Sequence, residues 1–227
     1  AYLNQVYGVP WERIGVIPQA ASETFQLNPA PAGAERMRRL LYVGQYAFVK
    51  APMILGGVVS RLLERDPNLT FTWVCAASHH QQALSHLGPA VRPRVTMLDW
   101  MLQHELIDVY DRHGVFLFPS FFEGFGKVFL EAMSRGLVVV AADNGGMKDI
   151  ISDGLDGYKV PTGDVQAMVR CVEAALADPQ ASAAVSNRAI QTASRFTWDA
   201  FARNSTAFYE SLIRQKKALN TDHGERR

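Results

Sequence analysis

Cysteine is scarce in this sequence. Cys75 and Cys171 are the only two among 227 residues, and their spacing resembles neither a zinc site nor a redox pair. Zinc-binding and thiol–disulfide functions that use paired cysteines are thereby excluded. Both cysteines stand in apolar stretches, so we expect two buried free thiols.

Long apolar runs and a leader sequence are also lacking. No apolar stretch approaches the roughly 18 residues that a membrane-spanning helix needs. The polar start Ala1–Asn4 does not resemble a signal peptide. We therefore expect a soluble, cytoplasmic protein. The chain begins without a methionine, so we also expect it to be a fragment of something longer.

A charge excess of either sign is absent as well. The 23 basic residues nearly balance the 22 acidic ones, for a formal net charge of +1. Proteins that bind nucleic acids usually carry a strong basic excess, so a nucleic-acid partner is not expected. A local site for an anion is still compatible with this balance.

What the sequence does contain is a regular alternation of short apolar runs and amphipathic segments from Arg38 onward. The apolar runs are continuous, which is typical of strands covered by helices on both faces. Such alternation predicts an α/β fold with a doubly wound parallel sheet. The predicted strands are Arg39–Gly44, Leu69–Ala77, Arg94–Leu98, Gly114–Ser120, Leu137–Asp143 and Gly157–Val160. The predicted helices are Ala51–Asp66, His79–Leu87, Leu102–Arg112, Gly126–Arg135 and Asp164–Asp178.

The two ends of the chain differ from this middle part. The opening residues predict the end of a helix, a Gly-Val-Pro turn and a short strand at Arg13–Pro18. The segment Ala20–Met37 is rich in Ala, Pro and polar residues and is interpreted as a linker. From Pro179 onward the chain is predicted to be helical, with Thr197–Ala218 as the last amphipathic segment. We expect the basic end Lys216–Arg227 to be frayed and solvated.

Ligands of a doubly wound sheet bind at the carboxyl ends of the strands, so loops there are candidate sites. The loop Glu123–Gly126 lies between the strand at Gly114–Ser120 and the following helix. Its glycines permit a close ligand approach, and free N–H groups at a helix start attract anions. A plain tight turn is the alternative interpretation of this loop.

Glu131 makes a ligand site the better interpretation. It lies within the apolar helical segment "VFLEAM". Burying an unpaired carboxylate there would cost on the order of several kcal/mol. Eight residues are a little over two helical turns, so Glu123 and Glu131 are expected to border one cleft. The alternative is a glutamate on a partly exposed helix edge. Two carboxylates suit a ligand with several hydroxyl groups.

At this point the sequence resembles a known family. Three segments, in this order along the chain, resemble the nucleotide-sugar-binding domain of retaining GT-B glycosyltransferases. They are "LLYVGQYAFVKAP", "VTMLDWMLQHELIDVYDRHGVFLFPS" and "PSFFEGFGKVFLEAMSRGLVVVAADNGGMKDIISDGLDGYKV". The likeness is strongest to glycosyltransferase family 4 (glycosyl transferases group 1), with its E-x7-E motif. It covers roughly Arg38 to Asp164 and implies a Rossmann-like domain, the C-terminal half of a GT-B fold.

The resemblance implies a role for each matching residue. Glu131 would bind the ribose hydroxyls of a nucleotide sugar, and Glu123 would face the donor sugar as a catalytic group. Lys50 would neutralise the leaving diphosphate as the second catalytic group. The remaining substrate-binding positions would be Gly44 and Gln45 in the phosphate loop, Met101 at the base, and Gly124, Phe125, Gly126 and Lys127 at the sugar or diphosphate. The family needs no metal or other cofactor.

Gln45 is the departure that matters, because the family usually has an arginine directly after the glycine of the phosphate loop. Losing one cation of a pair that stabilises diphosphate charge is expected to cost orders of magnitude in rate. A catalytically weakened nucleotide-sugar-binding or regulatory module is therefore the alternative function, and a nucleotide-sugar epimerase is a related enzyme alternative. One hypothesis is that Lys127 compensates for Gln45, since a lysine in the first turn of a helix is electrostatically misplaced without an anion.

Other features have simpler interpretations. His79 and His80, with His86 nearby, lack an accompanying Cys or carboxylate cluster, so no metal site is expected. Asp153-Gly154 and Asp156-Gly157 predict turns.

The resemblance also implies that half of the cleft is missing. Residues 1–30 would be the tail of an acceptor-binding domain and a linker, 31–197 the nucleotide-sugar-binding domain, and 198–227 a crossing helix with a basic tail. The expected partners are a nucleotide-sugar donor and the absent N-terminal acceptor-binding domain. Membrane contact would be peripheral and only through absent parts. The fragment alone is expected to be inactive.

Overall fold

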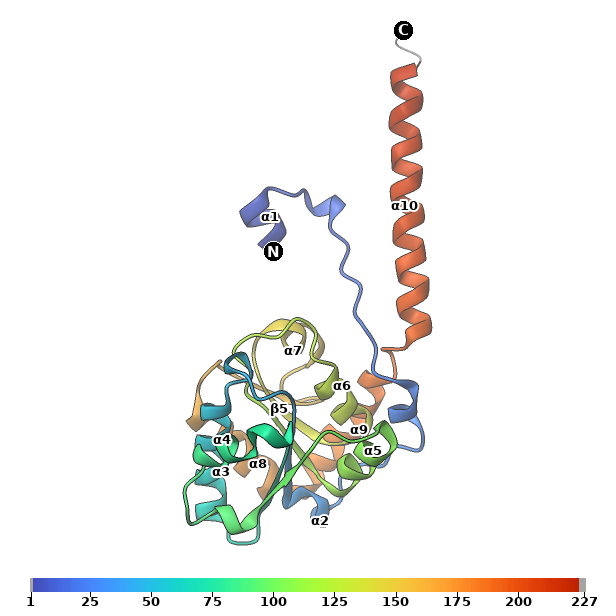
Figure 1. Ribbon diagram of the computed structural model, residues 1–227. Helices are drawn as coiled ribbons and strands as arrows, with labels where there is room; N and C mark the ends of the chain where they lie inside the picture. The colour runs from blue at the N-terminus through green and yellow to red at the C-terminus, as the bar shows by residue number, and fades with distance from the viewer. Residues whose placement is uncertain (1, 225–227) are drawn as a thin grey trace. The chain divides into compact units, whose positions relative to one another are not determined.

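The computed structural model describes residues 2–224 (Figure 1). Its contacts divide the chain into two compact units. The larger, Ala21–Arg195, contains the sheet. The smaller combines Ala1–Ala20 with Phe196–Arg227. The domain boundaries expected at residues 30 and 197 remain a prediction.

The larger unit is built on a six-stranded parallel sheet, which confirms the predicted fold class. The strand order β3-β2-β1-β4-β5-β6 reverses direction between β1 and β4, as in dinucleotide-binding folds. All residues of β4 and β5 are buried, because helices cover both faces of the sheet. The strands are β1 Arg39–Val43, β2 Thr70–Val74, β3 Val95–Leu98, β4 Val115–Phe118, β5 Val138–Ala142 and β6 Tyr158–Val160.

The helices follow the strands in chain order and pack in two groups. On one face α3 packs against α8, and on the other α6 packs against α9. Aspartates begin two of these helices: Asp164 accepts the N–H of Ala167 at α8, and Asp178 accepts those of Gln180 and Ala181 at α9. The helices are α2 Ala34–Met37, α3 Pro52–Arg65, α4 His80–Ser85, α5 Gln103–Arg112, α6 Lys127–Ser134, α7 Gly145–Ile150, α8 Val165–Ala177 and α9 Pro179–Ala193.

The interpretation of Ala20–Met37 as a linker is partly wrong, because much of this segment packs into the larger unit. Phe25 is 1% exposed, and its ring meets that of Tyr110 edge-on. The buried guanidinium of Arg135 donates to the carbonyls of Phe25 and Leu27 and pairs with Asp111 at 2.8 Å. These contacts hold residues 25–28 against α5 and the end of α6. The segment is therefore part of the folded core.

The smaller unit contains helices and extended chain. It comprises α1 (Tyr2–Tyr7), a single 3-10 turn at Trp11–Arg13 and α10 (Trp198–Gly224). The prediction of a strand at Arg13–Pro18 is wrong. Ile14–Pro18 is irregular, because no strand among the described residues pairs with it. Gly15 instead packs directly against the ring of Phe208.

The prediction that Lys216–Arg227 is frayed is also corrected in part, since helix α10 continues through Gly224. Residues 225–227, where the predicted basic end finishes, lie outside the described part of the chain. Within the described residues, no helix has both the length and the apolar character to cross a membrane.

The two cysteines differ. Cys75 is fully buried, and burial raises the pKa of its thiol to about 11, so this prediction is confirmed. Cys171 is only half-buried, because it lines a surface hollow beside Tyr158 and Arg170. The expectation of a second buried thiol is therefore wrong.

Candidate functional site

The loops after β1 and β4 lie next to each other because these strands are neighbours at the point where the sheet reverses. The N–H of Phe121 donates to the carbonyl of Val49 at 2.8 Å, and the rings of Phe48 and Phe121 lie 5.4 Å apart. Two segments more than 70 positions apart are thus tied at the carboxyl edge of the sheet. Ligands of such sheets bind at this edge.

Lys50 and Glu123 form an ion pair across these two loops. Their side chains are 20% and 13% exposed, so the pair is shielded but still reachable from solvent. The Lys50 ammonium also lies 5.8 Å from the centre of the Phe118 ring. Lys50 ends a one-turn 3-10 helix, and Ala51 follows with φ +54°, an unusual value for a residue with a Cβ. The two residues predicted as catalytic are therefore in direct contact.

The Glu123 loop is closely packed against α7, a helix that the sequence did not predict. A Cβ on Gly145 would lie 2.0 Å from the Glu123 carbonyl oxygen, and one on Gly146 would lie 2.3 Å from that of Phe125. Side chains at these two positions would collide with the backbone that carries Glu123. Gly126 has φ +84° and begins α6. Gly124, in contrast, has open space around it.

Glu131 lies on α6 and is partly exposed at the surface. The hydroxyl of Tyr110, on α5, donates to its Oε2 at 3.1 Å. Burial raises the pKa of the Glu131 carboxyl, while the Tyr110 hydrogen bond and the charge of Lys127 act in the opposite direction. Sequence reasoning expected a partner for this carboxylate, but it could not name one on a different helix. Lys127 is exposed in the first turn of α6.

The phosphate loop has unexpected neighbours. Gly44 is buried, and a Cβ there would lie 2.5 Å from the hydroxyl of Tyr42, so its lack of a side chain serves internal packing. Gln45 is exposed. The next residue, Tyr46, stacks near-parallel on the imidazoles of His79 and His86, with ring centres 5.3 and 5.9 Å away.

The histidines therefore have structural contacts in this structure. The Tyr46 hydroxyl lies 2.8 Å from His86 Nε2, and His80 Nε2 lies 3.1 Å from the Cys75 carbonyl. Within residues 2–224, no group of three or more His, Cys, Asp or Glu side chains is arranged to hold a metal ion. The two turns predicted at Asp153-Gly154 and Asp156-Gly157 are a single turn, Gly154–Asp156, which is closed by a bridge between Asp153 and Gly157.

Met101 lies in another hollow. It lines a space of about 710 Å³ beside β2 and β3, together with Thr72, Thr96 and His113. The role of Met101 at a base remains a prediction.

Two further polar groups near the carboxyl edge were missed by sequence reasoning. The Ser120 hydroxyl and the Asn144 side-chain oxygen are buried, and neither has a hydrogen-bond partner among the described residues. They are neighbours, since the Asn144 amide donates to the Ser120 carbonyl at 2.8 Å. Ser120 follows β4 directly before the Glu123 loop, and Asn144 precedes α7. No sequence signal separates them from ordinary turn residues.

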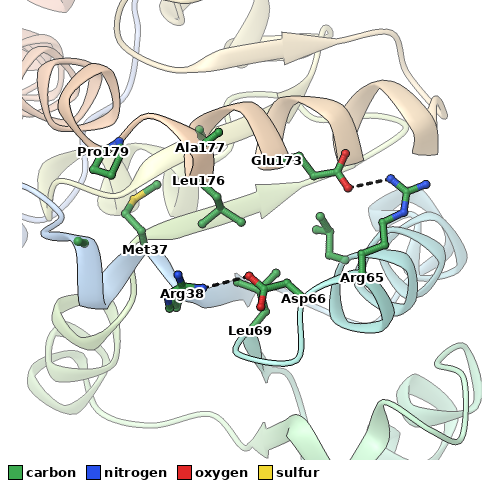
Figure 2. A pocket seen from close by; sticks show the side chains of 12 residues that line it. Met37, Arg38, Arg65, Asp66, Leu69, Glu173, Leu176, Ala177 and Pro179 are labelled. Carbon is green, nitrogen blue, oxygen red and sulfur yellow. Dashed lines mark hydrogen bonds and ion pairs between the residues drawn. The ribbon is translucent and has the colours of Figure 1, made fainter.

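A pocket at the opposite edge of the sheet from Lys50 and Glu123 has no unpaired charge among its lining side chains (Figure 2). It has a volume of about 360 Å³ and is lined mainly by apolar side chains such as Met37, Leu62 and Leu176. Its charged side chains are paired: Arg38 with Asp66 at 3.0 Å, and Arg65 with Glu173 at 2.7 Å. Arg38 and Leu69 directly precede β1 and β2, so this is the amino edge, away from Lys50 and Glu123. We assign no ligand to it.

Comparison with known proteins identifies the type of domain. Residues 37–178 match the family described as "Glycosyl transferases group 1". The D-inositol 3-phosphate glycosyltransferase of Streptosporangium roseum is 31% identical over 232 residues, which cover 93% of this chain and 52% of that protein. Its counterpart in Streptomyces bingchenggensis is 29% identical over 244 residues, with 96% and 52% covered. The chain thus spans about half the length of the curated relatives it matches.

Solved structures agree on the fold. The sucrose-phosphate synthase of Thermosynechococcus elongatus superimposes with a TM-score of 0.76 and 21% identity, covering 94% of this chain and 56% of that one. The Anabaena protein HepE in complex with UDP superimposes with a TM-score of 0.71 and 20% identity, covering 91% and 59%. At these identities the likeness shows the fold alone.

Proposed function

The chain belongs to the group 1 glycosyl transferases, and from that premise we propose that it is the donor-binding half of an enzyme that moves a sugar from a nucleotide sugar to an acceptor. The observation that carries the proposal is the contact between Lys50 and Glu123 at the carboxyl edge of the sheet, on the same loop–helix segment as Glu131. One cation and two carboxylates match the chemistry of a diphosphate attached to two polyhydroxyl rings. The naming of relatives as glycosyltransferases and the UDP in HepE support it.

In the proposed reaction each of the three residues has a separate task. The bond between the anomeric carbon and the diphosphate oxygen breaks, and a bond from that carbon to an acceptor oxygen forms on the same face, so the configuration is retained. The acceptor hydroxyl proton passes to the departing diphosphate. Lys50 stabilises the negative charge that develops on the diphosphate, and Glu123 orients the sugar. Glu131 accepts hydrogen bonds from the ribose.

Binding of donor would rearrange the resting ion pair. In the structure Lys50 is paired with Glu123, and a diphosphate would offer Lys50 a second anionic partner. The released carboxylate of Glu123 would then accept hydrogen bonds from sugar hydroxyls. Ser120 and Asn144 supply two more buried polar atoms beside this loop, and ligand hydroxyls would bond to them only after the rearrangement of the loop has exposed them. No metal ion has a part in this scheme, since the Lys50 ammonium supplies the positive charge that faces the diphosphate.

The relatives are about twice as long as this chain, which supports an acceptor-binding half outside it. Transfer would require that half, and this chain alone would bind donor and catalyse little.

A second candidate is a nucleotide-sugar-binding module with weakened catalysis. The observation that favours it is Gln45, an exposed neutral side chain where an arginine is usual in the resemblance described above. Donor hydrolysis by the full-length protein separates the two, because a binding module would bind the nucleotide sugar and leave it intact.

The test of donor binding is a thermal-shift screen of the 227-residue chain against UDP, GDP, ADP and their sugars. A ligand that binds only the folded state raises the unfolding midpoint by mass action. We expect one nucleotide to raise the midpoint of the natural chain and to have a much smaller effect on Glu131→Ala. If none of the nucleotides shifts the natural chain at millimolar concentration, the donor-binding proposal is wrong.

A further inference from the structure

The Glu131 carboxylate accepts a hydrogen bond from a buried side chain, that of Tyr110. Tyr110 is fully buried on α5, and its hydroxyl lies 3.1 Å from Glu131 Oε2 and 3.3 Å from the Val128 carbonyl. The hydroxyl has a single proton, and the charged carboxylate is the stronger acceptor of the two. This contact joins two helices that are separated in the sequence by β4 and the Glu123 loop.

We propose that Tyr110 is a positioning residue, which holds one oxygen of Glu131 so that the remaining acceptor sites of the carboxylate face the ribose hydroxyls. This inference rests on the proposed function, because it presumes that Glu131 meets the ribose. It assigns a task to a residue that makes no contact with the donor itself.

The phenol is suited to this task because its ring is fixed from two sides. The Phe25 ring packs edge-on against it at 5.7 Å, and the Phe116 ring of β4 packs at 6.0 Å with a tilt of 45°. Both of these rings are themselves buried. A ring held in this way presents its hydroxyl at one place, so the carboxylate is oriented before any ligand arrives.

The contact also favours the charged form of Glu131. Burial of the carboxyl raises its pKa, and the hydrogen bond from Tyr110 is the largest opposing influence. Tyr110 itself remains a donor, since burial and the neighbouring carboxylate raise the pKa of its phenol well above the usual value. An ionised carboxylate accepts hydrogen bonds from two ribose hydroxyls more strongly than a protonated one.

The decisive variant is Tyr110→Phe, which retains the ring between Phe25 and Phe116 and removes only the hydroxyl. The probe is whichever of UDP, GDP or ADP binds the natural chain, compared with its 2′,3′-dideoxy form, which lacks both ribose hydroxyls. We expect Tyr110→Phe to weaken binding of the ribonucleotide by about threefold to tenfold, the size of one ordinary hydrogen bond, because the bond that is lost positions Glu131 and does not itself reach the ligand. Binding of the dideoxy form should be unchanged.

Two controls separate positioning from a loss of stability. Tyr158→Phe removes a hydroxyl from β6, at the far edge strand of the sheet, and should leave both affinities unchanged. In a Glu131→Ala background, Tyr110→Phe should not alter the preference for the ribonucleotide any further. A merely structural role would weaken both forms of the nucleotide and would do so in either background.

A pH profile supplies a second signature. The preference for the ribonucleotide should fall as the pH drops through the pKa of Glu131. Because the hydrogen bond lowers that pKa, its removal should move this fall to higher pH in Tyr110→Phe.

The outcomes distinguish the inference from the proposed function. If Glu131→Gln reduces the preference for the ribonucleotide but Tyr110→Phe behaves as the natural chain, Tyr110 has no positioning role and Glu131 keeps its own. If neither Glu131 variant alters that preference, the ribose role of Glu131 and the inference are both overturned.

Discussion

Glu123 and Glu131 belong to one short segment, yet their surroundings differ in kind. Glu123 on the loop is paired with a cation, Lys50, from the neighbouring phosphate loop. Glu131 on the helix is held by a neutral donor, the hydroxyl of Tyr110. A diphosphate would compete with Glu123 for the Lys50 ammonium, whereas it would not compete with Glu131 for the Tyr110 hydroxyl. If the proposed donor binds, we therefore expect the ion pair at the loop end to be exchanged and the hydrogen bond at the helix end to be kept.

Removing the cation should have the largest effect. We expect Lys50→Ala to reduce donor hydrolysis or transfer by the full-length protein by about a hundredfold or more, because the charge on the leaving diphosphate loses its stabilising partner. Lys159→Ala is a matched control, since Lys159 is also 20% exposed and lies 3.7 Å from Asp143. Equal rates in Lys50→Ala and Lys159→Ala would show that the Lys50–Glu123 pair has no part in catalysis.

Displacing the loop without changing its charges should have the next largest effect. Gly146→Ala places a Cβ 2.3 Å from the Phe125 carbonyl oxygen, and backbone must move to accommodate it. We expect affinity for a nucleotide sugar to fall about tenfold, because small misplacements of binding groups are costly. Gly57→Ala on α3 is the control, since its Cβ would lie 3.7 and 3.8 Å from two atoms of the Val165 side chain, which are ordinary contact distances. Isothermal titration should find no loss in that control. An unchanged affinity in Gly146→Ala would mean that the loop position is not critical.

The two carboxylates should differ in the sign of their effect on stability. Glu123→Gln leaves Lys50 without its anionic partner, so the unfolding midpoint should fall. Glu131→Gln removes a carboxyl whose pKa is raised by burial. Its ionised form is therefore a cost to the folded state, and the midpoint at pH 7.5 should rise by about 1 to 2 °C, the range expected for a small gain in a chain of this size.

The pH dependence follows from the same shift. A carboxyl with a raised pKa in the folded state weakens folding most at high pH, and the penalty vanishes as the pH falls through the folded pKa to the ordinary value. The advantage of Glu131→Gln should therefore shrink as the pH is lowered from 7.5 to about 4.5. Differential scanning calorimetry at both pH values is the measurement. A midpoint that falls in both glutamine variants would contradict the distinction between the two carboxylates.

The smallest effect is expected at Lys127, between the two ends. Its charge acts on Glu131, and we propose that it also meets the diphosphate where Gln45 provides no cation. Lys127→Ala should weaken UDP or GDP binding by about threefold, and by less once Gln45→Arg is present. If Lys127→Ala has no effect in either background, Lys127 is an ordinary solvated lysine.

Much of the sheet could be predicted because its strands are continuous apolar runs. All six predicted strands from Arg39 onward exist, although β2 ends at Val74, three residues before the predicted end at Ala77. Helix α7 was missed because "GGMKDI" is only six residues long and begins with two glycines. The glycines are there for their contact with the Glu123 loop, which no local pattern reveals. The prediction of a strand at Arg13–Pro18 failed although its residues favour a strand. A strand forms only where another strand pairs with it, and none of the described strands does so here.

The members of the candidate site were named from the sequence, and their roles stay predictions; the contacts between them were not foreseen. Glu123, Glu131 and Lys50 were named from their positions on strand–helix loops and from the family resemblance. The direct pairing of Lys50 with Glu123 and of Tyr110 with Glu131 joins residues 73 and 21 positions apart. Such pairs depend on strand order, which local periodicity does not contain. Tyr110 carried no signal at all, since a tyrosine at the end of an amphipathic helix is ordinary core.

The close fit between α7 and the Glu123 loop has a consequence for protein engineering. Since Gly145 and Gly146 approach the carbonyls of Glu123 and Phe125 too closely for any side chain, neither segment has its shape independently of the other. A graft of the loop onto another scaffold would have to transplant residues 123–126 and 144–147 together, as one two-part cassette. Library designs that aim at a new donor sugar should likewise diversify side chains around this cassette and keep both glycines constant.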